Sequence, residues 1–332
     1  MTLKTPSFWY RDTGTSAPFM EKALVPVSSL YNFFFALHQK THKAEKVFTP
    51  IICIGNIVAG GTGKTPTSIA LMNTLLSHNI AKKPFFLIRG YGGAETGPTL
   101  VDLKTHTAWD VGDEALILAK HGPTIVGGDR VQSAHLAAQH GADMLLMDDG
   151  LQHARIYKDL KLVVINGEMG FGNKKLIPAG PLRQKLSEGL ALADGFILIG
   201  EDLRNIVADL PASKPLIKAS LKPTGDFKAD KTQTYIAFAG LGYPDKFFNF
   251  LKDTLKLNVP ECISFSDHHP YDEDDLMALN EKAQALSARL ITTEKDYLRL
   301  PKVDGITVET VPVEMMWDSE DDLIELIKER LS

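Results

Sequence analysis

A glycine-rich hexapeptide, Gly-Gly-Thr-Gly-Lys-Thr at residues 60–65, constrains the fold of this chain more than any other feature. It follows an apolar run at residues 48–56 that predicts a strand, and it opens a stretch at residues 65–80 whose apolar spacing predicts a helix. A strand, a glycine loop and a helix in this order gather backbone N–H groups and a helix N-terminus around one anion. The sequence therefore predicts a phosphate-binding loop, the alternative being a glycine-rich turn that only starts a helix.

The side chains of this loop suit a nucleoside triphosphate with Mg²⁺. Lys64 is expected to bridge the β- and γ-phosphates, and the Thr65 hydroxyl is expected to bind Mg²⁺. The full pattern G-x-x-x-x-G-K-[ST] requires a glycine at position 58, where Val58 stands. The expected nucleotide-binding residues of the loop are Val58, Ala59, Gly60, Gly61, Thr62, Gly63, Lys64 and Thr65.

Two further observations bear on the class of nucleotide-binding protein. Dimeric membrane-associated ATPases that act as switches carry a lysine directly before the double glycine, and this chain has Ala59 there. The N-K-x-D pattern of guanine-specific proteins does not appear, because residues 293–296 read Thr-Glu-Lys-Asp and lack the asparagine. The first observation counts against an ATPase that acts only as a switch, and the second favours ATP over GTP.

The rest of the chain alternates between apolar runs and helical stretches from about residue 50 onward. Continuous Val, Ile and Leu runs between helices predict a P-loop NTPase-type α/β fold, a parallel sheet with helices on both faces. A polar Pro- and Gly-containing stretch marks a boundary near residue 226, after which the alternation restarts. We expect an N-terminal segment at 1–45, a phosphate-loop core at 46–225 and a smaller α/β domain at 226–332.

Three groups of acids and histidines are candidates for the chemistry. Asp148 and Asp149 end a buried strand, where carboxylates hold Mg²⁺ in phosphate-loop proteins, although paired acids also cap helices. Asp113 and Glu114 start a predicted helix, and spacing alone does not separate a helix cap from a catalytic base. The Asp-His-His at residues 267–269 suggests metal or acid–base work, but two histidines without further ligands make a poor zinc site.

The N-terminal region carries a helix-like apolar stripe at Leu30, Phe33, Phe34 and Leu37. Residues 1–50 hold six Lys or Arg against three Asp or Glu, whereas the whole chain has a net charge of −5. Apolar side chains beside cations suit an interfacial membrane helix, and the alternative is a helix packed on the protein's own core. The acidic net charge argues against a nucleic-acid partner, and two distant cysteines indicate a reducing cytosol.

Read together, these segments resemble the tetraacyldisaccharide 4'-kinase family of lipid A biosynthesis. The matching segments span most of residues 50–300: 55–66, 89–93, 112–115, 148–160, 170–183, 239–248, 265–271 and 292–300. The family uses ATP and Mg²⁺ to phosphorylate the 4'-hydroxyl of an acylated glucosamine disaccharide 1-phosphate. The resemblance therefore implies a lipid-linked substrate and a peripheral enzyme at the cytoplasmic face of the bacterial inner membrane.

The resemblance also implies roles for individual residues. Asp113 is expected to take the proton of the sugar hydroxyl with help from His268, which the smaller domain brings to it on closing. Glu114, Asp148 and Asp149 are expected to organise Mg²⁺. Gln152 and His153 are expected beside the γ-phosphate, and Arg89, Tyr91 and Arg183 are expected to bind the anionic lipid.

The chain departs from the family pattern at three positions. Ile88 stands where the family commonly has serine, Tyr243 replaces the asparagine of a Gly-Asn-Pro, and Gln184 replaces an acid. These departures concern the shape of the acceptor pocket. Two other functions stay open from the sequence: a membrane-associated nucleotide switch and a phosphate-loop kinase for a small metabolite.

Overall fold

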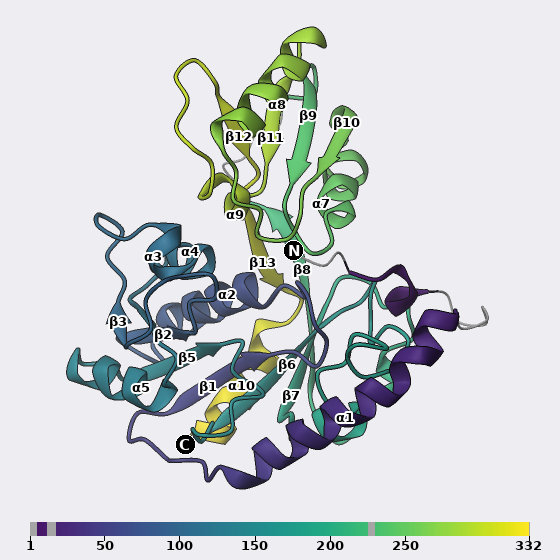
Figure 1. Cartoon of the computed structure of the whole chain (residues 1–332). Helices are drawn as coiled ribbons and strands as arrows, with labels where there is room; N and C mark the ends of the chain where they lie inside the picture. Colours follow the sequence, from purple (N-terminus) through teal and green to yellow (C-terminus); the bar gives the residue numbers. More distant parts are fainter. Residues whose placement is uncertain (1–4, 12–17, 225–229, 332) are drawn as a thin grey trace. The chain divides into compact units, whose positions relative to one another are not determined.

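The computed structural model describes residues 5–11, 18–224 and 230–331, and contacts divide the chain into two compact units. The larger unit comprises Pro6–Leu221 and Met315–Ser332, and the smaller unit is built mainly from Lys222–Glu314. Both are α/β structures, as Figure 1 shows. The expected boundary near residue 226 falls within 225–229, which lie outside the described residues.

The larger unit is built on a nine-stranded sheet in the order β13-β8-β7-β6-β1-β5-β2-β4-β3. Its strands are β1 (Ile51–Gly55), β2 (Pro84–Ile88), β3 (Thr99–Leu100), β4 (Thr124–Val126), β5 (Met144–Asp148), β6 (Leu160–Asn166), β7 (Gly195–Ile199), β8 (Leu216–Pro223) and β13 (Val313–Trp317). The strands from β8 through β4 pair in parallel, whereas the two edge strands are antiparallel to their neighbours. Edge strand β3 pairs with β4, and β13 runs against β8, because Thr224 N donates to Pro312 O and Asp318 N donates to Lys218 O. The predicted parallel sheet is confirmed.

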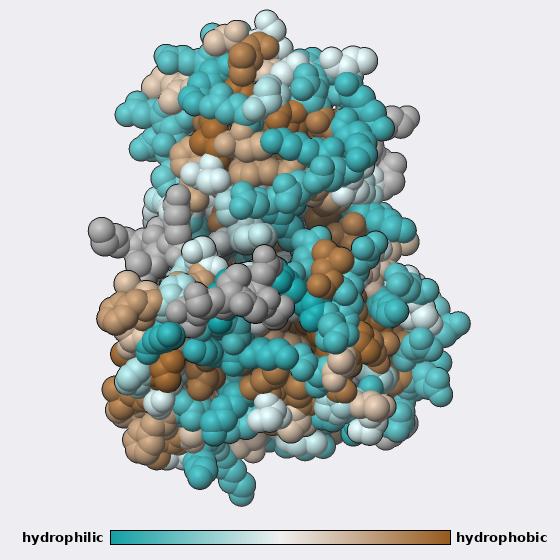
Figure 2. All heavy atoms as spheres, turned by 90° about the vertical axis from the view of Figure 1, so that its right-hand side faces the viewer, coloured by the Kyte–Doolittle hydropathy of each residue, from teal (hydrophilic) through white to brown (hydrophobic). Residues whose placement is uncertain are grey.

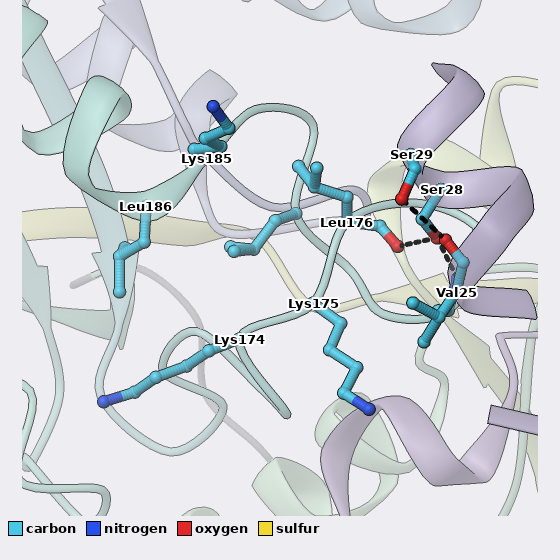
Figure 3. A pocket seen from close by; sticks show the side chains of 10 residues that line it. Val25, Ser28, Ser29, Lys174, Lys175, Leu176, Lys185 and Leu186 are labelled. Carbon is cyan, nitrogen blue, oxygen red and sulfur yellow. Dashed lines mark hydrogen bonds between the residues drawn. The ribbon is translucent and has the colours of Figure 1, made fainter. Parts of the chain in front are cut away.

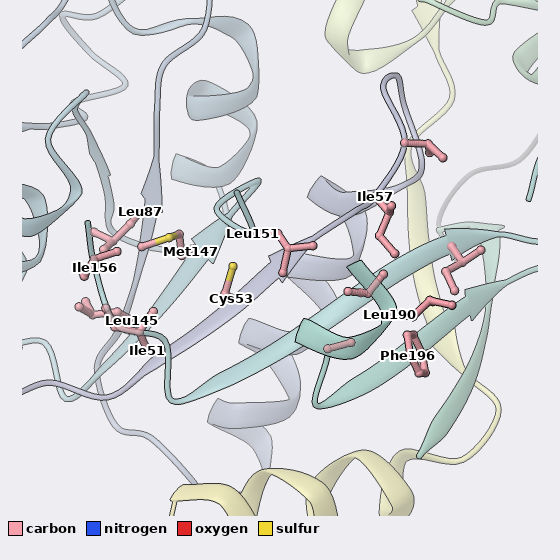
Figure 4. Packing of buried hydrophobic residues seen from close by; sticks show 14 of the residues in the cluster. Ile51, Cys53, Ile57, Leu87, Leu145, Met147, Leu151, Ile156, Leu190 and Phe196 are labelled. Atoms are coloured by element: carbon pink, nitrogen blue, oxygen red, sulfur yellow. The ribbon is translucent and has the colours of Figure 1, made fainter. Parts of the chain in front are cut away.

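Helices cover both faces of this sheet. One face packs alternate strand residues such as Ile51, Leu87 and Leu145 into a cluster with α5 (Arg130–Gln139) and α6 (Leu186–Leu192), shown in Figure 4. The intervening strand residues pack on the other face, beneath α2 (Lys64–Ser77), α4 (Asp113–Ala119) and α10 (Glu320–Leu331). The short α3 (Ala108–Val111), η1 (Ser7–Tyr10) and η2 (Val207–Asp209) lie in connections.

The smaller unit is a four-stranded parallel sheet in the order β10-β9-β11-β12. Its strands are β9 (Thr234–Ala239), β10 (Asn258–Ser264), β11 (Arg289–Thr292) and β12 (Val308–Thr310). Helix α8 (Glu273–Ala285) packs on one face of the sheet, and α7 (Asp245–Asn249) with the π-helical turn η3 (Phe250–Thr254) packs on the other. The short α9 (Glu294–Tyr297) follows β11.

The observed units differ from the expected domains at both ends of the chain. Residues 315–332 belong to the larger unit, not to a smaller domain at 226–332. The reason is that β13 joins the edge of the large sheet beside β8, and α10 buries an apolar face there, with Leu326 close to Gly195 of β7. From Pro6 onward the N-terminal segment also belongs to the larger unit.

The N-terminal helix α1 (Phe19–Thr41) packs on the larger unit with a polar face and turns its apolar face outward. The expected stripe is exposed: Phe33 is 61% exposed, Phe34 58% and Leu37 49%. Glu21 and Ser28, by contrast, are buried. Within the described residues, no helix combines the length and the apolar character needed to span a membrane.

Candidate active site

The phosphate loop leaves the carboxyl end of β1 and leads directly into α2. Gly60 and Gly63 have φ angles of 108° and 95°, a left-handed region that L side chains rarely adopt. A Cβ at Gly63 would also lie 2.7 Å from Ile199 Cδ1. Buried Asn56 steadies the loop, because its amide donates to Thr62 Oγ1 at 3.0 Å. The backbone conformation therefore favours glycine at positions 60 and 63, and position 63 also lacks room for a Cβ.

Val58 and Ala59 anchor the loop to the segment that ends in Arg183. Val58 is 4% exposed and pairs with Leu182 in an isolated antiparallel bridge. The Ala59 N–H donates to Pro181 O at 2.7 Å, so this amide is already used. The valine at position 58 thus fills the core beneath the loop, and the amides that can turn to phosphate begin at Gly60.

Thr65 and Asp148 form an oxygen pair beside the loop. The Thr65 hydroxyl donates to Asp148 Oδ2 at 3.2 Å, and both side chains are buried. The pair arises from sheet order, because β5 lies beside β1 with Asp148 opposite Ile54. Among the described residues, no three His, Cys, Asp or Glu side chains form a metal site by themselves. The Thr65–Asp148 oxygen pair fits Mg²⁺, which takes one or two protein oxygens together with phosphates and water.

Asp149 joins two cations at the site. Its carboxylate accepts a forked pair of hydrogen bonds from Arg183, at 2.8 and 3.2 Å, and Lys64 Nζ lies 3.6 Å away. Burial alone would raise the pKa of Asp149, but Lys64 and Arg183 hold this pKa below its ordinary value. Burial lowers the pKa of Lys64, and the nearby Arg183 charge adds to this effect. Arg183, expected at the lipid, thus contacts the acid that faces the loop lysine.

Gln152 connects the phosphate loop to the segment after Arg183. Its side-chain amide donates to Asn56 O at 2.8 Å and to Gln184 Oε1 at 3.2 Å. The neighbouring His153 is partly buried, and burial together with the Arg130 charge lowers its pKa to about 4. His153 is therefore a neutral imidazole near pH 7.

Asp113 opens α4 and is 4% exposed. Its Oδ1 accepts the N–H of Glu114 at 2.8 Å, and Gly112 before it has a φ of 86°. The charge of Glu114 raises the pKa of Lys64, which places this carboxylate within electrostatic reach of the phosphate loop. The two acids are therefore not equivalent: one is buried at the helix start, and the other acts on the loop lysine.

The loop that carries Arg89 and Tyr91 packs closely against the turn before Asp113. A Cβ on Gly93 would lie 2.8 Å from Gly112 N, and a Cβ on Gly112 would lie 2.7 Å from Tyr91 O. The Tyr91 side chain is 69% exposed, and Arg89 is exposed as well. Since β2 lies beside β5, this loop, Asp148 and the phosphate loop all follow the carboxyl ends of three neighbouring strands.

The Asp-His-His motif lies in the smaller unit, between β10 and α8. The backbone of His268 has a φ of 53°, and its side chain is 35% exposed. His269 is held on both sides of its ring: Nε2 lies 2.7 Å from Asp275 Oδ2 and Nδ1 lies 3.3 Å from Ser266 Oγ. These contacts give His269 a structural role within the loop.

Known proteins resemble this chain along almost its whole length. The sequence model of the family described as "LpxK: Tetraacyldisaccharide-1-P 4'-kinase" matches residues 20–332. The tetraacyldisaccharide 4'-kinase of Paramagnetospirillum magneticum is 42% identical over 322 residues, 96% of this chain and 95% of its own. The chain belongs to the tetraacyldisaccharide 4'-kinase family. The Rhodospirillum centenum member is 40% identical over 332 residues, covering 99% of this chain and 97% of its own.

A solved structure of a member of this family shares the fold. The crystal structure described as the "apo" form of LpxK from Aquifex aeolicus in complex with ATP matches with a TM-score of 0.74 at 24% sequence identity. The match covers 95% of this chain and 100% of that chain. The family assignment and the α/β fold expected from the sequence are both confirmed.

The departures from the family pattern have local explanations at two positions. Ile88 ends β2, is 4% exposed and pairs with Val126 of β4, so an apolar residue belongs there. Gln184 is 1% exposed and accepts from Gln152, a neutral hydrogen bond that needs no buried charge. Nothing in the structure explains Tyr243, which is 41% exposed.

From the sequence alone, Asn56 is not assigned to the site, and Gln184 stands out only as a departure from the family pattern. Both are polar and almost fully buried; Asn56 contacts Thr62 within the loop, and Gln184 accepts from Gln152, 32 residues away. A signal existed for Asn56, because a polar residue directly after a buried apolar strand and before a glycine loop often supports the loop. No local pattern indicated the contact of Gln184 with Gln152.

Proposed function

We propose that this chain transfers the γ-phosphate of ATP to the 4'-hydroxyl of a tetraacylated glucosamine disaccharide 1-phosphate. The observation that carries the proposal is family membership over residues 20–332, in a chain whose phosphate loop stands beside Thr65 and Asp148. The phosphate loop indicates that a nucleotide is the phosphate donor, and membership in the family indicates the acceptor. The product is a 4'-phosphorylated lipid of lipid A biosynthesis.

The larger unit supplies the groups that bind the nucleotide. The N–H groups from Gly60 to Thr65, at the start of α2, donate hydrogen bonds to the phosphates, and Lys64 exchanges its contact with Asp149 for one with the γ-phosphate. Thr65 and Asp148 would hold Mg²⁺, with Asp149 and Glu114 nearby. When bound, Mg²⁺ neutralises phosphate charge. We place Gln152 and His153 beside the γ-phosphate. Because the pKa of His153 is lowered, this side chain is neutral there and adds no positive charge.

Asp113 is the proposed base for the sugar hydroxyl. As the 4'-oxygen bonds to the γ-phosphorus and the bond to the β-phosphate oxygen breaks, the hydroxyl proton passes to the Asp113 carboxylate. A buried carboxylate at a helix start is fixed in position, which suits a reaction in which positioning dominates. His268 of the Asp-His-His motif is the proposed assistant of this base, the role that the family resemblance implies for it.

The acceptor carries phosphate and acyl chains, and exposed groups of the larger unit suit each part. Arg89 and Tyr91 are exposed next to the turn before Asp113, where a cation and a phenol can meet a phosphorylated sugar. Arg183 contributes positive charge from the other side of Asp149. We assign these three side chains to the headgroup of the lipid.

Helix α1 fits a membrane surface because its amphipathicity is reversed relative to that of a helix buried on a core. Its inward face is polar: Ser28 donates to Leu176 O at 2.8 Å and Gln39 to Gln152 O at 2.7 Å. Its outward face exposes Phe19, Met20, Val25, Val27, Leu30, Phe33, Phe34 and Leu37. Figure 2 shows hydrophobic groups among hydrophilic ones on the side of the larger unit to which α1 belongs.

A pocket beside α1 adds cations to this surface. It has a volume of about 350 Å³ and is lined by Val25, Ser28, Ser29, Lys174, Lys175, Leu176, Ala179, Leu182, Lys185 and Leu186, as Figure 3 shows. Each of the three lysines is paired with a carboxylate of the chain, Lys174 with Asp209, Lys175 with Glu21 and Lys185 with Glu188. The anionic headgroups of a bilayer would compete with these carboxylates for the lysines next to the exposed apolar helix. We therefore place the enzyme peripherally on the cytoplasmic face of the inner membrane, with α1 lying in the interface.

The proposed function is tested by incubating the purified chain with γ-labelled ATP and the acylated disaccharide 1-phosphate in vesicles. Label in the lipid supports the kinase. Label only in free phosphate would overturn the proposal in favour of a nucleotide switch. A set of small phosphate acceptors, assayed in parallel without vesicles, separates a kinase for soluble metabolites from a lipid kinase.

A further inference from the structure

The smaller unit contains a buried carboxylate whose contacts converge on the loop of His268. Asp296 is 0% exposed and accepts four hydrogen bonds within its own unit. The donors are Gly240 N at 2.9 Å, Tyr271 Oη at 2.8 Å, Arg299 Nη2 at 2.8 Å and Thr293 Oγ1 at 2.6 Å. Burying a charge costs free energy unless the charge is paired and hydrogen-bonded. These four hydrogen bonds therefore stabilise the buried carboxylate of Asp296.

The donors to Asp296 also hold the loop at residues 265–271. Arg299 Nη1 donates to His269 O at 3.0 Å, and Arg299 Nη2 donates to Gly240 O at 3.3 Å. The same Gly240 carbonyl accepts the His268 N–H at 3.1 Å. The Tyr271 ring packs edge-on against His269, with centroids 4.9 Å apart. Asp296 therefore bonds directly to Gly240, whose carbonyl accepts the His268 N–H, and is linked through Arg299 to the carbonyl of His269.

The loop needs such support because its backbone is held in an uncommon conformation. His268 has a φ of 53°, in the left-handed region that costs free energy for a residue other than glycine. The approach of the two loops is also close: a Cβ on Gly240 would lie 2.9 Å from Ser266 O and 3.1 Å from His269 Cβ. Surrounding contacts must therefore fix the direction in which His268 leaves the loop.

We propose that Asp296 is a positioning residue for His268, acting through Gly240, Tyr271 and Arg299. The inference rests on the proposed catalytic assistance by His268 and assigns a role to the Thr-Thr-Glu-Lys-Asp segment that ends at Asp296. Asp296 belongs to the smaller unit and contacts no nucleotide-binding residue of the larger one among its described hydrogen bonds. It sets geometry without touching the reacting atoms.

The test is Asp296→Asn, which keeps the shape but cannot accept from four donors as a carboxylate does. We expect kcat for lipid phosphorylation to fall about 100-fold, the cost of misplacing a catalytic group by about 1 Å, with KM for ATP unchanged. In a His268→Ala background the same substitution should change kcat by less than about twofold, because the two residues act through one pathway. Equal losses in both backgrounds would overturn the proposal.

A matched control separates positioning from general destabilisation. Val259 is 6% exposed at the start of β10 and packs on the face of the small sheet opposite the one that holds Tyr271. Val259→Ala should lower the melting temperature yet leave kcat within about twofold of wild type. If Asp296→Asn does not fold, Tyr271→Phe removes one donor and should lower kcat while Val259→Ala does not.

A second readout needs no lipid substrate and separates this inference from the proposed function. Amide hydrogen exchange at His268 should quicken in Asp296→Asn and Tyr271→Phe but not in Val259→Ala. Unchanged exchange at His268 in both loop variants would overturn the positioning role. Absence of lipid phosphorylation by the wild-type chain would instead overturn the proposed function, while the exchange comparison still decides the role of Asp296.

Discussion

At the scale of single residues, the charged side chains of the candidate site pair with one another. Lys64 contacts Asp149 at 3.6 Å, and Arg183 clasps the same carboxylate. Burial lowers the pKa of Lys64 because it disfavours the charged ammonium, and an anion that approaches stabilises this charged form. A γ-phosphate is a stronger partner than a single carboxylate, and we infer that Lys64 moves from Asp149 to the nucleotide on binding.

The role of Asp113 leads to the first prediction. Asp113→Ala should lower lipid phosphorylation by about 1,000-fold, within the usual range for loss of a general base, while the Kd for ATP stays unchanged. Calorimetric titration with a non-hydrolysable ATP analogue measures the binding. Asp102→Ala, a change at an exposed carboxylate, serves as the control. Normal phosphorylation by Asp113→Ala would remove Asp113 from the mechanism.

The pH dependence of stability supplies a second prediction at His153. Its folded pKa is lowered from 6.5 to about 4, so between these values the unfolded chain binds a proton that the folded chain does not. Stability should therefore fall as pH decreases from 6.5 to 4. His153→Asn removes this contribution, and its free energy of unfolding in urea should fall less between pH 7 and pH 5 than that of wild type. Equal decreases would contradict a neutral, buried His153.

Residues differ in how far the sequence predicts them. Lys64, Thr65 and Asp148 follow from the loop pattern and from sheet order, because their chemistry requires those residue types at those places. The pairing of Arg183 with Asp149 does not follow, since residues 34 positions apart meet only through the fold. Val58 shows the converse: its departure from the pattern is explained by burial against Leu182, which no local rule contains.

At the scale of elements, α1 connects the outward apolar face to the active site. Tyr31 Oη donates to Arg183 O at 2.8 Å, and Gln39 donates to Gln152 O at 2.7 Å. The helix thus supports two site segments with its polar face while offering phenylalanines to the outside. Periodicity predicted the helix and its stripe, but periodicity does not state which face meets the protein.

The third prediction concerns this outward face. Phe33→Ser with Phe34→Ser should reduce binding to anionic vesicles by at least about tenfold, because each exposed ring contributes roughly 1.5–3 kcal/mol when buried in the interface. The melting temperature should not change, since both rings are more than half exposed. Leu76→Ser on α2, at a side chain 42% exposed, is the matched control. Undiminished vesicle binding by the double variant would remove α1 from the membrane contact.

At the scale of the whole molecule, the chain leaves the larger unit after β8 and returns to it with β13 and α10. This returning segment is hydrogen-bonded to α2, the helix that follows the phosphate loop. Thr74 Oγ1 donates to Glu320 Oε1 at 2.6 Å and accepts from Trp317 Nε1 at 3.1 Å. Sequence alternation predicted two α/β units but not this return, because strand pairing between distant segments leaves no local pattern.

The fourth prediction tests that return. Thr74 is 2% exposed, and Thr74→Val removes its hydrogen bonds to Trp317 and to Glu320, although Glu320 keeps its contact with His78 at 3.5 Å. The substitution should lower the free energy of unfolding of the larger unit by about 1 kcal/mol. Chemical denaturation measures the change. Asn73→Ala, at an exposed position of the same helix, should change it by less than about 0.5 kcal/mol. Equal effects would show that the C-terminal segment does not stabilise the phosphate-loop helix.

The most direct test of the account is the position of the transferred phosphate. The wild-type chain is incubated with γ-labelled ATP and the acylated disaccharide 1-phosphate, and the lipid product is analysed by phosphorus NMR. We predict a new phosphomonoester on the 4'-oxygen, with the 1-phosphate unchanged, and its loss in Asp113→Ala. A diphosphate at position 1, or labelled free phosphate with unmodified lipid, would contradict it.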